Sequence, residues 1–322
     1  MNVRQGIEGL ATLPQGMALS VGNFDGLHRG HASILSLCRS LRAAGATGVA
    51  FATFEPHPLT VLRPESAPPR LMSLSQKHDA LAAAGVDCLV ELPPTPDVLN
   101  VTAERFWEIL RDQTRPSHIV EGATFSFGKG RAGTIDRLRE WCRQSAVQLH
   151  EIDPVTVPLV DLQVVPVSSS LIRFLLSVGR VRDAAICFGR PYSLRGLVVK
   201  GHQRGRTIGV PTANLTITEQ LIPGEGVYSA RCTVDGSSYP VALSIGTMPT
   251  FGENPPQVEA HLIGFSGDLY DRTITLEVVD WIRDQRKFAS VDALKQQLAR
   301  DIHTAASLAD IRTADPIAAV FA

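Results

Sequence analysis

Residues 20–31 read SVGNFDGLHRGH, and the first half of the chain is best understood by starting from this stretch. A short apolar segment leads into a turn built from Gly, Asn and Asp, and two histidines follow in the spacing H-x-G-H. The pattern is typical of a buried strand that gives way to a helix. His28 and His31 are therefore expected at the amino-terminal end of that helix.

Strands and helices alternate as the chain continues from this turn. Compact apolar runs predict buried strands at 17–22, 48–54, 87–92 and 117–122. Between them, apolar residues at helical spacing predict helices over 31–45, 73–85 and 101–112, with Ser73 or Ser75 and Thr102 as candidate N-caps. Alternation of this kind predicts βαβ units, and so an α/β fold with a doubly wound parallel sheet.

The pattern changes after about residue 190. Strand-like segments at 195–201, 226–246, 257–265 and 272–282 are separated by Gly and Pro, and Asp235-Gly236 predicts a hairpin turn. We expect an antiparallel sheet or small β-barrel, covered by a terminal helix over 290–305 with Ser290 as its N-cap. Two short helices within 171–193 separate the halves, so the sequence predicts a domain boundary near 186–190.

Length and composition narrow the class of protein. A chain of 322 residues suits two domains, because single cores rarely grow beyond about 250–300 residues. Lys and Arg number 31 against 32 Asp and Glu, so no overall field attracts nucleic acid or anionic lipid. The five cysteines form no C-x-x-C pair, which favours free thiols. With no signal peptide or membrane span in the sequence, we expect a cytoplasmic protein with small-molecule substrates and neither nucleic-acid nor membrane partners.

The histidine turn is expected to bind an anion. Ligands of open parallel sheets lie beyond the carboxyl ends of the strands, where a helix N-terminus offers free N–H groups. Imidazoles there can hydrogen-bond phosphate oxygens and stabilise the charge that builds up in nucleotidyl transfer. Two other interpretations stay open: polar residues that merely begin a helix, or metal ligands together with His57 of the TFEPHP segment.

A second polar cluster supports the phosphate interpretation. VSSSLIRFLL at 167–176 begins a helix with Ser168, Ser169 and Ser170, and Arg173 follows one turn later. Hydroxyls and a guanidinium at a helix N-terminus suit a triphosphate. Ser168 also fits the role of a plain N-cap.

The second half carries two further candidates. GHQRGRTIGVPTAN at 201–214 is rich in Gly and Arg and enters a stretch poor in strands, as a phosphate-binding loop would, but it is no Walker A motif. In QVEAHLIGF, Glu259 shares a strand face with Gln257 and His261. Such a carboxylate is usually a solvated residue on the outer face.

Taken in order, VGNFDGLHRGH, TFEPHP, VSSSLIR and QRGRTIGVPTAN resemble the bifunctional riboflavin kinase/FAD synthetases of bacteria, and the similarity runs through nearly the whole chain. The resemblance implies a nucleotidyltransferase-type FMN adenylyltransferase domain over 1–187 and a β-barrel riboflavin kinase domain over 188–315. It implies Mg²⁺ as cofactor, with ATP, riboflavin, FMN and FAD as substrates or products.

The resemblance also assigns residues in the first domain. His28 and His31 would hold ATP phosphates and stabilise the transition state. The other residues implied to bind ATP or phosphate are Gly22, Asn23, Phe24, Asp25, Ser168, Ser169, Ser170 and Arg173. Flavin or nucleotide contacts are implied for His57, Thr124 and Phe127.

In the second domain, Glu259 matches the family's general base, which acts on the ribityl 5′-hydroxyl of riboflavin. Thr212 and Asn214 match the residues that hold magnesium and phosphate. The remaining residues implied to bind ATP or flavin are Gly201, Arg204, Gly205, Arg206, Gly209, Pro211 and Arg283.

The chain departs from the family pattern G-x-[DN]-[FW]-x-F-G, since it reads GATFSFG at 122–128. Thr124 replaces a carboxylate or amide, which predicts slow adenylylation or weak FMN binding relative to the kinase step. Two alternatives follow: an active kinase with a weakened or altered N-terminal half, and a non-enzymatic flavin-binding regulator. A regulator would be expected to lose His28, His31, Thr212, Asn214 or Glu259, and all five are present.

Overall fold

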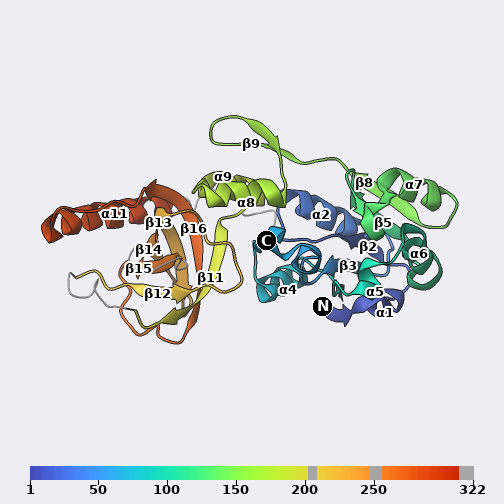
Figure 1. Cartoon of the computed structure of the whole chain (residues 1–322), viewed down its shortest axis with the longest axis horizontal. Helices are drawn as coiled ribbons and strands as arrows, with labels where there is room; N and C mark the ends of the chain where they lie inside the picture. Colours follow the sequence, from blue (N-terminus) through green and yellow to red (C-terminus); the bar gives the residue numbers. More distant parts are fainter. Residues whose placement is uncertain (202–208, 247–255, 312–322) are drawn as a thin grey trace. The chain divides into compact units, whose positions relative to one another are not determined.

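The computed structural model describes residues 1–201, 209–246 and 256–311, which form two compact units (Figure 1). The first unit comprises Met1–Pro68 and Leu74–Thr156, and the second comprises Pro69–Ser73 and the chain from Val157 onward. The functional boundary near residue 188 that the sequence predicts is a different division and stays a prediction.

The first unit contains a six-stranded parallel sheet in the order β1-β4-β3-β2-β5-β8. Its strands are β1 (Asn2–Gln5), β2 (Ala18–Val21), β3 (Val49–Phe54), β4 (Cys88–Leu92), β5 (His118–Gly122) and β8 (Gln148–Ile152). The chain leaves β2 toward β3 and β4 and then crosses to β5 on the other side of β2. The predicted doubly wound parallel sheet is thus confirmed.

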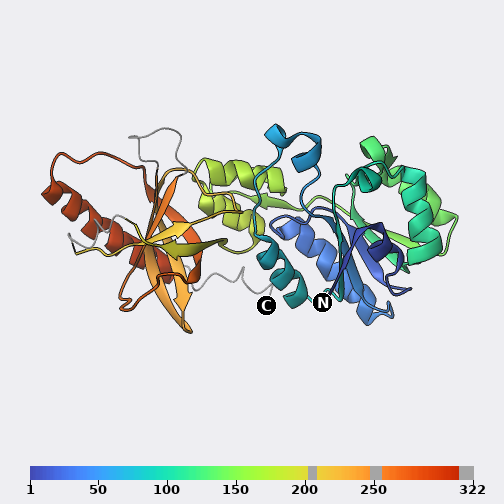
Figure 2. The same ribbon diagram turned by 60° about the horizontal axis from the view of Figure 1, so that its bottom comes forward.

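Helices cover both faces of this sheet (Figure 2). They are α1 (Gly6–Ala11), α2 (Arg29–Ala43), α4 (Leu74–Ala83), α6 (Ala103–Glu108) and α7 (Ile135–Arg143). Apolar side chains of α1, α6 and α7 form one core with alternate residues of β2–β5. Helices α2 and α4 cover the opposite face, where their buried residues Ile34, Cys38 and Leu81 lie on the side of the remaining strand residues.

Short elements connect the sheet strands. They are α3 (Leu59–Leu62), η1 (Pro64–Ser66), α5 (Pro96–Leu99), the π-helical η2 (Ile109–Thr114), β6 (Ser126–Phe127), η3 (Lys129–Arg131) and β7 (Gly133–Thr134). The single helix predicted over 101–112 is therefore α6 continued by η2. Thr102 caps α6 as predicted, since its hydroxyl accepts a hydrogen bond from the Arg105 N–H at 3.1 Å.

The second unit contains a closed six-stranded antiparallel barrel in the order β11-β12-β15-β14-β13-β16. Its strands are β11 (Tyr192–Val199), β12 (Ala213–Thr216), β13 (Gly226–Val234), β14 (Ser237–Gly246), β15 (Gln257–Leu262) and β16 (Thr273–Arg283). The predicted hairpin joins β13 to β14, and Asp235 and Gly236 have the positive φ values, 50° and 81°, that such a tight turn requires. The stretch expected to be poor in strands ends sooner than predicted, because β12 begins at Ala213.

Further elements precede and follow the barrel strands in the sequence. They are β9 (Thr156–Pro158), β10 (Val164–Pro166), α8 (Ser169–Ser177), α9 (Val181–Phe188) and α11 (Val291–Ile311). Side chains of α8 and α9 share one core with the barrel interior. Helix α11 runs longer than predicted, and Ser290 caps it by accepting from the Ala293 N–H at 3.2 Å.

Within the described ranges, no helix combines the length and apolar character needed to cross a membrane. The five cysteines are free, as the sequence predicted, and all five are buried.

Candidate active sites

The two histidines of H-x-G-H form a stacked pair at the start of α2. Nδ1 of His28 accepts a hydrogen bond from the His31 N–H at 3.4 Å, so His28 caps the helix. The ring centroids lie 3.7 Å apart with 16° between the planes. A Cβ at Gly30 would lie 3.2 Å from two atoms of the His28 ring, so the glycine makes room for it. The spacing therefore builds a compact imidazole pair.

The surroundings of the two rings determine the tautomer of His28 and the pKa of His31. Because Nδ1 of His28 accepts, the proton of the neutral ring is on Nε2, where it can be donated. Burial, with the charges of His28 and Lys77, holds the pKa of His31 well below its usual value. Nδ1 of His31 is buried and has no hydrogen-bond partner within the described residues. The His31 ring is thus held neutral, and its buried Nδ1 lies next to the stacked ring of His28.

The backbone of the turn takes unusual conformations. Phe24 and Leu27 have φ values of 45° and 43°, in the left-handed region that non-glycine residues rarely adopt, and both are 2 % exposed. The Asn23 carbonyl accepts from the Thr53 hydroxyl at 2.9 Å and from Lys77 Nζ at 3.3 Å. Buried contacts therefore hold this turn in place.

The histidine turn lies at the point in the sheet where the order of the strands reverses. Strand β2 is the point from which the chain extends to both sides, and ligands of such sheets bind at the carboxyl ends of the strands there. Backbone pairing of β2 with β5 covers Ala18 and Leu19. At Val21 the N–H donates instead to the Glu121 carboxylate at 2.6 Å, and burial raises the pKa of Glu121 well above its usual value. The two strands are thus held by a side chain just before the histidine turn.

His57, Thr124 and Phe127, the residues predicted to contact flavin or nucleotide, lie in three different environments. His57 follows β3, and its Nδ1 accepts from the Leu59 N–H at 3.2 Å. Thr124 is exposed in the turn after β5. Phe127, by contrast, is 6 % exposed and packs with Phe106 in the core of the first unit.

Ser168–Ser170 and Arg173 belong to the second unit. Ser168 caps α8, since its hydroxyl accepts from the Leu171 N–H at 3.2 Å, so the plain N-cap interpretation is confirmed for this serine. Arg173 donates through Nε to the Pro69 carbonyl at 2.7 Å.

Strand register brings the predicted kinase residues together on the barrel. Asn214 of β12 is directly opposite Glu259 of β15, and Glu259 is opposite Ser244 of β14. Val258 and Ala260 point into the core, so Glu259 faces outward and is partly exposed. Residues directly opposite on one face have Cβ atoms about 4.5–5.5 Å apart, which places the Asn214 amide beside the Glu259 carboxylate.

Gly201 approaches the same pair. A Cβ there would lie 2.3 Å from the side-chain nitrogen of Asn214, closer than any real contact. Glycine is therefore required for Asn214 to keep its place.

A cavity of about 530 Å³ lies on the barrel, and Gly201, Asn214 and Glu259 are not among its lining residues. Thr212 and Pro211 line it, and His261 donates from Nδ1 to the Pro211 carbonyl at 2.7 Å, which fixes the approach to Thr212. The other lining residues are Val198, Ala213, Ala260, Leu262, Phe265, Ser266, Gly267, Asp268, Leu269 and Tyr270. Gly209 precedes this segment with a φ of 84°, while Arg204, Gly205 and Arg206 lie outside the described residues.

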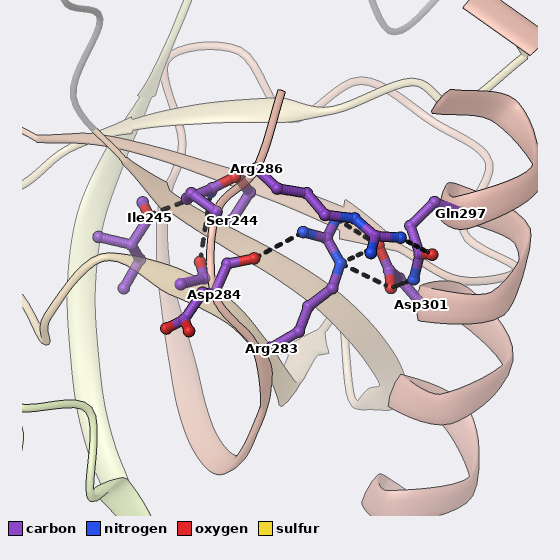
Figure 3. A network of polar contacts seen from close by, with 9 residues as sticks. Ser244, Ile245, Arg283, Asp284, Arg286, Gln297 and Asp301 are labelled. Atoms are coloured by element: carbon purple, nitrogen blue, oxygen red, sulfur yellow. Dashed lines mark hydrogen bonds and ion pairs between the residues drawn. The ribbon is translucent and has the colours of Figure 1, made fainter. Parts of the chain in front are cut away.

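Arg283 has a structural partner. Figure 3 shows its guanidinium directed at Asp301 of α11, with Nη2 2.7 Å from the carboxylate, and Nη1 donates to the Asp284 carbonyl at 2.8 Å. Asp301 is 2 % exposed. The arginine predicted to lie near flavin and nucleotide thus ends β16 and anchors the terminal helix.

Sequence reasoning missed three charged residues around the histidine turn: Lys77, Glu55 and Glu121. A signal was present for Lys77, which lies three residues after Leu74 and four before Leu81, on the apolar face of the predicted helix. Within the described ranges, no three His, Cys, Asp or Glu side chains gather to hold a metal, so the metal interpretation of His28, His31 and His57 lacks support.

Comparison with known proteins covers both units. A family model for FAD synthetase matches residues 11–170, and one for riboflavin kinase matches 188–309. Bifunctional riboflavin kinase/FMN adenylyltransferases of Pseudomonas fluorescens and Escherichia coli K12 are 33% and 35% identical, covering 96% and 95% of this chain and 98% and 97% of theirs. A solved structure described as a macrolide-efflux protein from Streptococcus pneumoniae aligns with a TM-score of 0.85 and 26% identity, covering 95% of this chain and 99% of that one. The chain therefore belongs to the family of bifunctional riboflavin kinase/FMN adenylyltransferases.

Proposed function

We propose that the two activities of this family use separate sites in the chain, with FMN made on the barrel and FAD made at the histidine turn. The corresponding functional domains would span 1–187 and 188–315, and the family matches at 11–170 and 188–309 fall within these ranges. The stacked histidine pair at the switch point of a parallel sheet is the observation that carries the assignment of adenylylation to the first unit.

At the barrel, Glu259 accepts the proton of the riboflavin 5′-hydroxyl as that oxygen attacks the γ-phosphorus of ATP. The bond from the γ-phosphorus to its bridging oxygen breaks, ADP leaves and FMN forms. The partly exposed carboxylate on the outer strand face, beside Asn214, is consistent with this role. A positioned base of this kind typically contributes about 10²–10⁴ in rate.

The barrel residues also fit magnesium. The hydroxyl of Thr212 and the amide oxygen of Asn214 are the hard oxygen ligands that Mg²⁺ prefers, and Mg²⁺ usually takes few protein ligands besides phosphates and water. When bound, the ion would neutralise charge on the ATP phosphates. Gly201 keeps the Asn214 amide free to face this site.

At the histidine turn, a phosphate oxygen of FMN attacks the α-phosphorus of ATP, pyrophosphate leaves and FAD forms. No protein nucleophile is needed. His28 donates from Nε2 and the neutral His31 hydrogen-bonds a second oxygen, so charge that develops on the phosphates meets preorganised donors. We further propose a cytoplasmic location with small-molecule partners, which the five free thiols support.

Incubating the purified protein with riboflavin, ATP and Mg²⁺ and resolving FMN from FAD over time tests this assignment. FMN should appear first and FAD later, and Thr124 is expected to make the second step slow. Accumulation of FMN with no FAD would contradict the adenylyltransferase assignment and favour a kinase with an altered first unit.

A further inference from the structure

Lys77 of α4 is a buried cation close to the histidine turn. It is 4 % exposed, and its Nζ lies 3.1 Å from a carboxylate oxygen of Glu55 and 3.3 Å from the Asn23 carbonyl oxygen. Burying an ammonium is costly even when it is paired, and well-packed apolar residues are often at least as stabilising. A contribution to stability therefore does not by itself explain why Lys77 and Glu55 are paired here.

The second contact of Lys77 provides one. The Asn23 carbonyl that accepts from Lys77 also accepts from the Thr53 hydroxyl. This carbonyl belongs to the peptide that leads into Phe24, whose φ of 45° lies in the left-handed region that non-glycine residues rarely adopt. A strained conformation of this kind persists only when its surroundings hold it. Two donors from two different elements fix the orientation of this one peptide.

Phe24 connects the peptide to the histidines. Its ring centroid lies 5.3 Å from that of His31 at an angle of 68°, and 4.4 Å from that of Phe51. His31 in turn stacks on His28. A shift of the Asn23–Phe24 peptide would therefore move the surface against which the histidine pair is packed.

We propose that Lys77, held by Glu55, is a positioning residue for FMN adenylylation: it fixes the Asn23 carbonyl and thereby the placement of His28 and His31. The inference rests on the proposed role of the histidine pair. Lys77 acts through the turn, so its removal should lower kcat for FAD formation more than it raises KM.

The test compares Lys77→Met with the double variant Lys77→Met/Glu55→Gln in the full chain. The single variant removes the Lys77 ammonium that lies 3.1 Å from the Glu55 carboxylate, and it should melt at a lower temperature. The double variant removes both charges and should recover most of that stability. Its kcat for FMN to FAD should nevertheless stay about 10- to 100-fold low, as expected when reacting groups are slightly misplaced.

Two matched measurements separate positioning from folding. Riboflavin phosphorylation on the barrel should remain within twofold of the parent protein in every variant. His78→Gln alters another polar contact of α4, the 2.6 Å contact between Nε2 of His78 and Glu91, and should leave FAD formation unchanged.

The proposal is overturned if the double variant makes FAD at the parental rate, or if both activities fall in parallel. Failure of the underlying function looks different, because a His28→Ala/His31→Ala protein that still made FAD would refute the role of the histidines whatever Lys77 does.

Discussion

The two candidate sites are built in contrasting ways. At the histidine turn the reactive groups are fixed by buried contacts: His28 is 6 % exposed, Phe24 and Leu27 are left-handed, and a buried ion pair holds the Asn23 carbonyl. On the barrel, Asn214 and Glu259 are partly exposed and are placed by strand register. The first site therefore depends on packing throughout its surroundings, whereas substitutions at the second should affect one reaction and little else.

The largest expected effect is that of Glu259→Gln. Glutamine keeps the shape of the side chain but cannot accept the proton, so riboflavin phosphorylation should fall by about 10²–10⁴. Formation of FAD from supplied FMN and the melting temperature should not change, because the side chain lies on the outer face of the strand. Chromatographic assay of both reactions checks this, and intact FMN production would show that another group is the base.

His28→Ala/His31→Ala should break the other site. Loss of one preorganised donor typically costs about 10²–10³ in rate, so FAD formation should drop by at least that factor while FMN accumulates. Riboflavin phosphorylation serves as the internal control. If elemental analysis instead found bound zinc in the parent protein and none in the variant, the histidines would be metal ligands.

Gly201→Ala tests the barrel site again, and its expected effect on kinase activity is smaller than that of Glu259→Gln. The added Cβ would lie 2.3 Å from the Asn214 side chain, which can rotate away, so the site and not the fold is disturbed. We expect about a 10-fold loss in kinase activity and a higher Mg²⁺ requirement, as is usual when the support of a metal ligand is altered. Titration of kinase activity with Mg²⁺ measures it, and an unchanged Mg²⁺ dependence would argue against Asn214 as a ligand.

Glu121→Gln tests the buried side of the comparison through pH. Burial raises the pKa of Glu121, whereas in the unfolded chain it ionises near pH 4.3. The folded protein therefore retains a proton that the unfolded chain loses, and stability falls as pH rises from about 4.3 through the folded-state pKa.

Glutamine abolishes this titration and keeps a carbonyl to accept from the Val21 N–H. The variant should melt higher than the parent at pH 8, by about 2–4 °C for each kcal/mol recovered, and equally near pH 4. An identical pH dependence of melting in the two proteins would mean that Glu121 is not held neutral.

The sequence was informative where local pattern determines structure. The strand–turn–helix at 20–31, the hairpin at Asp235-Gly236 and the caps at Thr102 and Ser290 depend on neighbouring residues, and all are confirmed. The edge strands β1 and β8 and the four-residue β12 were missed, because short or polar segments become strands only through pairing with the rest of the sheet.

The candidate sites divide in the same way. The H-x-G-H spacing is local, and so the histidines could be found from sequence. The facing of Asn214 and Glu259 depends on register between strands 45 residues apart, and the pairing of Arg283 with Asp301 depends on where α11 docks. Motif resemblance indicated Asn214, Glu259 and Arg283 but not Asp301, and no periodicity could have predicted these pairings.

The most direct test of separate sites mixes the two disabled proteins. Glu259→Gln alone and His28→Ala/His31→Ala alone should each fail to convert riboflavin into FAD in the presence of ATP and Mg²⁺. Together they should succeed, because the histidine variant makes FMN, which the Glu259 variant then adenylylates. FAD from either variant alone, or no FAD from the mixture, would contradict the account.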